Sequence, residues 1–287
     1  MPGHPNLPSF VLIRKPEDVR TVLWPALLFG LTRVCWKFDV YAGIPLLMYF
    51  TFACAAISHN SMHCRVFYFD NIEQVWRVVL SLSYGHPVNT FIPGHNLSHH
   101  KFLQKEEDLM RTDQMQYEWP ILNLLLFHAT VAPKVFKQDM DYMLRSWRES
   151  RAAGRWCEYT VSTCVQMCAV VGVQLWLLWI DVRKAVLLWW LPRFFAQWAI
   201  VTMNLLQHHG CDSDEKKYNF ARNFVSPELN YLMFNNGYHT IHHKLPNTHW
   251  SQYPYLHRRI VAPEIRPELD EPSMIGYVWR TYVALST

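Results

Sequence analysis

The sequence predicts an all-α integral membrane protein with a water-facing helical cap. Four stretches of the 287-residue chain are apolar and approach the length of a membrane-spanning helix. The mean hydropathy is −0.06, so a polar part must balance these stretches. Many histidines also recur at helical spacing. We therefore expect a single domain over residues 1–287, with four transmembrane helices in two hairpins, interfacial helices and a cytosolic cap that holds a His-rich site.

The first predicted hairpin consists of residues 21–34 and 40–57. At about 1.5 Å per residue, eighteen helical residues span about 27 Å, close to the thickness of a bilayer core. The first stretch is shorter and carries Arg33 near its end, so its assignment depends on its partner. Pro25 and Pro45 lie inside the stretches, and membrane helices tolerate such kinks.

The segments between the hairpins are amphipathic or charged. Residues 72–93 contain Glu73 and Arg77, which favours an interfacial helix or a re-entrant segment. The apolar run at 119–133 is about fifteen residues long and should lie on the membrane rather than cross it. Residues 134–158 are rich in Lys and Arg, which is typical of a solvated face or of a cytoplasmic segment.

The second predicted hairpin, residues 159–180 and 185–207, returns the chain to the cytosolic side. Residues 208–287 contain no apolar span, so we expect them to form the cytosolic cap. This topology leaves most of the 27 Lys and Arg residues in the cytosol, as the positive-inside rule requires. The exceptions are Arg33, Lys37, Arg183 and Lys184 on the far side and Arg193 within the membrane.

Nine of the fifteen histidines fall into four clusters at helical spacing, one of which includes an asparagine. Residues three or four apart share one face of a helix, so each cluster can point its side chains to one place. A single cluster of this kind could equally well be a polar, His-rich turn on the surface. Neutral imidazole binds iron, zinc, copper and nickel, and nine ligands suit two ions with open positions. The clusters are His59 and His63; His95, His99 and His100; Asn204 and His208; and His239, His242 and His243.

These clusters and their flanking residues resemble the membrane-bound fatty acid desaturase superfamily. The segment NNGYHTIHHKLPNTHW (235–250) is similar to the last histidine box of acyl desaturases, and GHNLSHHKFLQKEEDLMRT (94–112) resembles the middle box. The first box has three residues between its histidines, where stearoyl-type enzymes have four. The resemblance covers about residues 20–260, and the superfamily also includes hydroxylases and carotenoid oxygenases.

The resemblance implies that the nine histidines bind two iron ions in a di-iron centre, with Asn204 as an outer or water-mediated ligand. It implies no catalytic side chain beyond these ligands. The expected reaction uses O2 to introduce a double bond into a long acyl chain linked to a lipid, to CoA or to a carrier protein. A ferredoxin or a cytochrome b5-type protein would donate electrons, and no nucleic acid is expected. The site would face the cytosol from a bacterial inner membrane or the endoplasmic reticulum.

The sequence is compatible with several other functions. A fatty acid or alkane hydroxylase, or a carotenoid ketolase or hydroxylase, would use the same metal site. A non-catalytic scaffold or a zinc hydrolase is a third class, although the sequence contains no HExxH or serine-based motif. Asp108, Asp212 and Asp214 could orient imidazole rings or be plain surface charges. The aromatic residues at 189–198 could line a substrate tunnel or pack in the core.

Overall fold

The computed structural model of the protein describes residues 12–212 and 218–284, and most of these residues are helical. The long helices are α1 (Asp18–Phe38), α2 (Ile44–His63), α3 (Asp70–Tyr84), α5 (Pro120–Ala152), α6 (Glu158–Ile180) and α8 (Leu191–His208). Short segments join them: η1 (Tyr41–Gly43), η2 (Val88–Thr90), η3 (Ile92–His99), α4 (His100–Phe102), η4 (Thr112–Gln114), α7 (Val182–Lys184) and η5 (Ala185–Trp190). The expectation of a helical protein is therefore confirmed.

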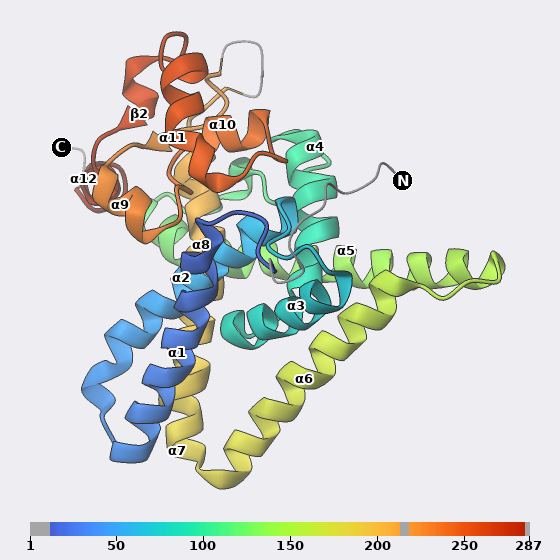
Figure 1. Ribbon diagram of the computed structural model, residues 1–287. Helices are drawn as coiled ribbons and strands as arrows, with labels where there is room; N and C mark the ends of the chain where they lie inside the picture. The colour runs from blue at the N-terminus through green and yellow to red at the C-terminus, as the bar shows by residue number, and fades with distance from the viewer. Residues whose placement is uncertain (1–11, 213–217, 285–287) are drawn as a thin grey trace.

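The C-terminal part is built from short elements that cover one end of the long helices (Figure 1). Its helices are α9 (Pro227–Leu232), α10 (His239–Lys244), η7 (Trp250–Gln252), α11 (Tyr253–Leu256), η8 (His257–Val261), η9 (Pro267–Leu269), α12 (Met274–Val278) and η10 (Trp279–Val283). Within the described ranges, the sheet structure consists of β1 (Asn223–Phe224) and β2 (Asp270–Glu271), which pair in parallel. This pair joins two parts of the C-terminal segment that are distant in sequence.

Three helical segments have the length and composition needed to cross a membrane. They are Tyr41–His63, Glu158–Ile180 and Val182–His208, and they correspond to the predicted spans 40–57, 159–180 and 185–207. The remaining predicted span, 21–34, lies within α1, which has 21 residues but is not among the three. The two hairpins are present as helix pairs, because α1 leads into α2 and α6 leads into α8 (Figure 1).

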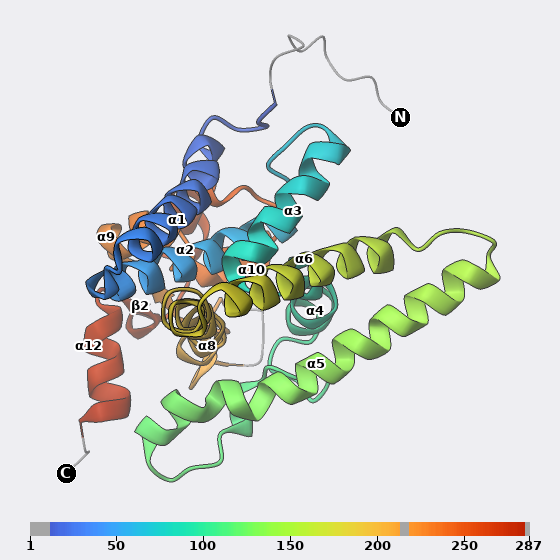
Figure 2. The same ribbon diagram turned by 90° about the horizontal axis from the view of Figure 1, so that it is seen from below.

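Helices α1, α2 and α8 pack beside one another, as the two views show (Figures 1 and 2). Small side chains allow α2 and α8 to approach closely: Ala53 and Ala55 on α2 and Ala196 on α8 are buried in one core cluster. Helix α6 leaves this bundle at an angle and meets α5 away from it (Figure 1). The ends of α2 and α8 that carry histidines both reach the C-terminal elements.

Helix α5 is longer than the sequence predicted. It runs as one helix of 33 residues through Pro133, whereas we expected a short surface helix at 119–133 and a separate charged segment after it. Its inward positions continue past the proline, from Phe127 and Val131 to Asp139, at intervals of four or eight residues. The side chains on this face continue to pack against the protein, which offsets the backbone hydrogen bond that proline removes.

The amphipathic segment 72–93 is divided into two parts. Helix α3 ends at Gly85, whose positive φ of 84° is the conformation that commonly stops a helix. The chain then enters η3, a π-helix of eight residues that carries two of the predicted ligands, His95 and His99. π-Helical segments are rare and often occur at functional sites.

Candidate metal centre

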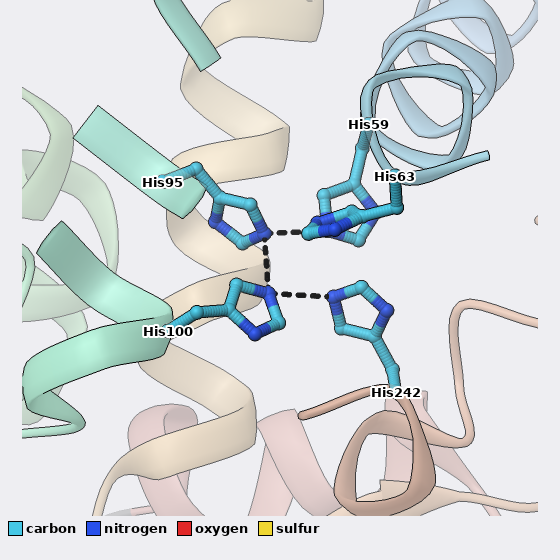
Figure 3. Close-up of side chains that lie close together, drawn as sticks. All are labelled: His59, His63, His95, His100 and His242. Atoms are coloured by element: carbon cyan, nitrogen blue, oxygen red, sulfur yellow. Dashed lines mark hydrogen bonds between the residues drawn. The ribbon is translucent and has the colours of Figure 1, made fainter. Parts of the chain in front are cut away.

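Five of the histidines singled out in the sequence converge from three parts of the chain (Figure 3). His59 and His63 come from the last turn of α2, His95 and His100 from η3 and α4, and His242 from α10. One ring nitrogen of each lies within 4.8 Å of the others. The Nε2 atom of His95 is 2.8 Å from that of His59 and 3.0 Å from that of His100, which is in turn 3.0 Å from that of His242.

The other four histidines form a second group. His99, His208, His239 and His243 also have one ring nitrogen each within 4.8 Å of the others. The Nε2 atoms of His208, His239 and His243 form a triangle with sides of 3.0, 3.1 and 3.2 Å. The nine histidines are therefore divided five and four between two neighbouring groups.

The hydrogen bonds of the second group leave lone pairs pointing at one another. The Nδ1 of His208 lies 2.9 Å from the carbonyl oxygen of Phe220, which can only accept, so this Nδ1 carries the proton. A neutral His208 then presents a bare Nε2 to the triangle. The Nε2 of His99 is buried beside it without a hydrogen-bond partner. Converging lone pairs repel one another unless a cation lies between them, so the geometry fits a bound metal ion.

The distances also agree with metal binding. A histidine nitrogen lies about 2.0–2.1 Å from a bound zinc ion, and other divalent transition metals have similar distances. Two ligand nitrogens at this distance from one metal ion are about 3 Å apart when their bonds to the metal form a right angle. The Nε2–Nε2 separations in the two groups are close to this value, at 2.8–3.2 Å. An all-imidazole set suits iron, zinc, copper or nickel rather than magnesium or calcium.

Burial keeps these imidazoles in the form that binds metal. Burial, followed by the charges of neighbouring histidines, places the pKa of His95, His100, His239, His242 and His243 well below the ordinary value. Metal binding requires neutral imidazole, so near neutral pH a metal ion can bind without first displacing a proton from these rings.

Asp108 supplies a negative charge behind His99. Its carboxylate accepts from the His99 Nδ1 at 2.8 Å, and both side chains are fully buried. Burial raises the pKa of Asp108, but its pairing with His99 and hydrogen bonds from the backbone N–H groups of Gln104 and Met110 outweigh this effect, and the pKa falls to about 2. The ionised carboxylate fixes the ring orientation and makes Nε2 a stronger donor to a metal.

Helix α10 is held in place by backbone and asparagine contacts. Asn223 on β1 accepts a hydrogen bond from the Thr240 N–H at 2.9 Å, and the Phe224 N–H donates to the Gly237 carbonyl at 2.9 Å. A Cβ at Gly237 would lie 2.2 Å from the Phe224 carbonyl oxygen, so only glycine fits there. This close approach brings the His239–His243 turn against α8.

A cavity of about 280 Å³ opens beside both groups. Histidines of both groups line it, His59 and His95 from the first and His239 from the second. Most of the remaining wall is apolar and comes from α5 and α8, for example Val131, Ile200 and Val201. The cavity therefore offers a largely apolar wall next to both histidine groups.

Comparison with known families agrees with this geometry. The family model for fatty acid desaturases matches residues 36–272. The chain belongs to the fatty acid desaturase family. The matched region contains all nine histidines and the cavity, and the family is a membrane-bound oxidoreductase class whose members are typically iron-dependent. No match was found among curated proteins or among solved structures.

The expectation that each histidine cluster of this family member points to one place is wrong for two clusters. His99 and His95 belong to different groups, and so do His239 and His242. In the π-helix η3 the backbone hydrogen bonds join residues five apart, as the bond from the His100 N–H to the His95 carbonyl does. His95 is therefore grouped with His100 rather than with His99. On α10, His239 and His243 share a face at a spacing of four, which leaves His242 to face the other group.

The other residues that the sequence singled out lie in different surroundings. Asn204 lines the cavity one turn before His208, with its Nδ2 donating to the Met110 carbonyl and its Oδ1 buried without a partner. Asp212 pairs with Arg266 at 3.3 Å and not with a histidine, whereas Asp214 lies outside the described residues. The aromatic residues at 189–198 do not line the cavity, and Trp190 and Phe194 are exposed on the outer face of the bundle.

Three groups that orient the rings were not predicted. The Nδ1 of His59 lies 2.8 Å from the Asn236 Oδ1, and the Nδ1 of His242 lies 3.0 Å from the Tyr253 hydroxyl. The third is the backbone carbonyl of Phe220. Asn236 is part of the NNGYHTIHH motif, so its position was a usable signal. Tyr253 is eleven residues from His242 and the carbonyl carries no sequence information, so neither had a local signal.

Proposed function

We propose that the protein is an O2-dependent di-iron acyl desaturase, which introduces a double bond into a long acyl chain. The observation that carries this proposal is that two groups of buried and half-buried imidazoles meet at one largely apolar cavity. A hydrolase acting on polar substrates would not need an apolar cavity of this kind. The match to the desaturase family supports the same reaction class.

In this proposal one iron is held by His59, His63, His95, His100 and His242 and the other by His99, His208, His239 and His243, with Asn204 as an outer ligand. Two bound irons would supply the oxidising power needed to break strong methylene C–H bonds. Overall, two hydrogens leave the chain as O2 is reduced to two waters by two electrons and two protons from outside. The protein's own part is to position the acyl chain beside the histidines and to exclude water from it.

The proposed substrate is a chain linked to a lipid, to CoA or to a carrier protein. The proposed electron donor is a ferredoxin or a cytochrome b5-type protein. We place the protein in the lipid bilayer with four spanning helices, and we place the C-terminal cap and the iron site on the cytosolic face. The basic character of the chain, with a formal net charge of +4, would favour an acidic donor protein.

The test compares fatty acids in a host that expresses the chain, the His242→Ala variant or the His209→Ala variant. His209 is the matched control, because it adjoins His208 but bonds to the Tyr282 hydroxyl and belongs to neither group. Mass spectrometry should find a product lighter by two hydrogens with the wild type and His209→Ala, but not with His242→Ala. Elemental analysis of the purified protein should find two irons per chain.

Other results would change the proposal in defined ways. A product heavier by one oxygen would identify a hydroxylase on the same metal site. Two bound irons with no change in fatty acids, when an electron donor is supplied, would mean that the substrate is not a common acyl chain. A protein that folds but binds no iron would contradict the di-iron proposal itself.

A further inference from the structure

One wall of the cavity contains a buried carboxyl group that has no role among the metal ligands. Asp139, on the inward face of α5, is 4% exposed and lines the cavity. Its Oδ1 has no hydrogen-bond partner among the described residues. The residues that line the cavity include no Lys and no Arg. Burial lowers the pKa of the two lining histidines outside the metal groups, His86 and His128, which favours their neutral form, so they do not supply a positive charge to this carboxyl group near neutral pH.

The carboxyl group approaches the segment that carries the metal ligands. Gly94 directly precedes His95, and a Cβ on Gly94 would lie 3.4 Å from the Asp139 Oδ1 and 3.1 Å from a Val135 methyl group. The missing side chain of Gly94 thus lets α5 bring its carboxyl group against η3. The carboxyl group and the histidines therefore face one shared space.

The surroundings of Asp139 favour its neutral form. Burial raises the pKa of this carboxyl group to about 8. Tyr84 and Tyr159 lie near it, and neither side chain can carry a positive charge. A neutral carboxyl group both donates and accepts a hydrogen bond, and buried polar groups in folded proteins are nearly always satisfied by protein, water or ligand.

We infer that Asp139 binds a neutral polar group on the substrate, one that both donates and accepts a hydrogen bond, as a hydroxyl or an amide does. The inference rests on the proposed function for the acyl character of the chain and adds a polar group within the cavity. An anionic carboxylate or phosphate placed beside Asp139 would find no Lys or Arg among the lining residues to pair with. A plain hydrocarbon chain would leave the Asp139 carboxyl group unsatisfied.

Binding of matched C18 probes to the iron-loaded protein tests this inference. The probes are octadecanamide and octadecan-1-ol, with 1-chlorooctadecane, octadecanoate and octadecylamine for comparison, each displacing one fluorescent fatty alcohol. For the wild type we expect the amide and the alcohol to bind about tenfold more tightly than the chloride. Asp139→Leu should remove this preference, whereas Asp139→Asn should retain most of it because an amide also donates and accepts.

Asp141→Asn is the control, because it removes a carboxylate from the same helix but from an exposed position, where Asp141 pairs with Lys137. It should leave the preference unchanged. Equal binding of all neutral probes by the wild type would overturn the inference, and so would tightest binding of the amine, which would make Asp139 a counter-ion. Because the assay measures binding and not turnover, a protein that prefers the amide but forms no double bond would contradict the proposed function alone.

Discussion

At the scale of single residues, the site depends on the atoms behind the imidazoles. The Nδ1 of His99 meets the Asp108 carboxylate, that of His59 meets Asn236, and that of His208 meets a backbone carbonyl. Each partner fixes which nitrogen faces the metal. Asp108 is the one charged member of this set, so its removal should have the largest effect on metal affinity.

Asp108→Asn should weaken iron binding by the group that contains His99. The amide keeps the size of the side chain but removes the negative charge, and an amide nitrogen facing Nδ1 would leave two donors opposed. We expect about a 10- to 100-fold loss of affinity at that site, measured by titrating iron into the metal-free protein. Asp113→Asn, at an exposed residue that pairs with Arg111, is the control. Equal affinities in both variants would contradict a role for Asp108.

Asp139 should make stability depend on pH in a direction opposite to that of an ordinary paired carboxylate. Its pKa is about 8 in the folded protein and should be near 3.9 when unfolded, so the folded state binds the extra proton between these values. Its contribution to the free energy of unfolding is therefore present below about pH 4 and is lost as the pH rises towards 8, by up to about 1.4 kcal/mol per pH unit.

The measurement is the difference in Tm between the wild type and Asp139→Asn, taken in detergent from about pH 5 to about pH 8. Asparagine cannot ionise, so the wild type should lose Tm relative to the variant as the pH rises. Parallel curves for the two proteins would show that Asp139 is not a buried neutral acid.

The histidines themselves were predictable because their spacing is a local property of the sequence. All nine lie in the two groups, and Asn204 lies beside them. Their division into five and four was not predictable, since it depends on the π-helical turn at His95–His99 and on the direction from which α10 approaches. Tyr253 was missed because contact across the fold, and not sequence distance, places its hydroxyl against His242.

At the scale of elements, the apolar spans 40–57, 159–180 and 185–207 were predictable because length and hydropathy define them. The extent of α5 was not. Pro133 and the basic residues after it indicated a break, whereas the inward face of the helix continues to Asp139. The predicted boundary failed because packing of that face, which no local pattern reveals, stabilises the helix through Pro133.

The turn between β1 and α10 is the element most sensitive to a small change. Gly237→Ala would place a methyl group 2.2 Å from the Phe224 carbonyl and 2.6 Å from the Asn230 Oδ1, so β1 and α10 must separate. We expect a loss of about 1–3 kcal/mol or more in the free energy of unfolding, together with weaker iron binding by His239 and His243. Thermal unfolding and iron content measure the two effects.

Gly172→Ala is the matched control, since a Cβ there has no atom within 4 Å. Its stability should be unchanged or greater by up to about 1 kcal/mol, because alanine favours a helix over glycine. If both variants lost the same stability, the close approach at Gly237 would not be the cause.

At the scale of the whole molecule, the contacts at the two ends of α1 bear on how many helices cross the membrane. At its start, the carboxylate of Asp18 lies 3.3 Å from the Trp250 indole nitrogen and 3.2 Å from a His249 ring nitrogen, both in the C-terminal cap. Just beyond its other end, Asp39 pairs with Lys184 of α7 at 2.9 Å. Helix α1 thus runs from the cap to the turn between α6 and α8.

The 21 residues of α1 span about 31 Å, which matches the bilayer core. If α2 and α8 cross the membrane, α1 must cross beside them, although Arg33 and Lys37 lower its hydropathy. Those two charges lie near the end that faces Lys184, where they can reach the far interface. We therefore predict four crossings rather than the three that hydropathy alone supports.

Single cysteines in a background without the seven native ones would test this topology with a membrane-impermeant maleimide. Val19→Cys and Lys244→Cys, at exposed positions of the first turn of α1 and of α10, should react only in inverted vesicles. Val40→Cys and Val182→Cys, at the exposed turns at the other end, should react only from outside. If Val19→Cys and Val40→Cys reacted from the same side, α1 would not cross the membrane. If Lys244→Cys reacted from outside, the candidate iron site would not face the cytosol, and electrons from a cytosolic carrier could not reach it directly.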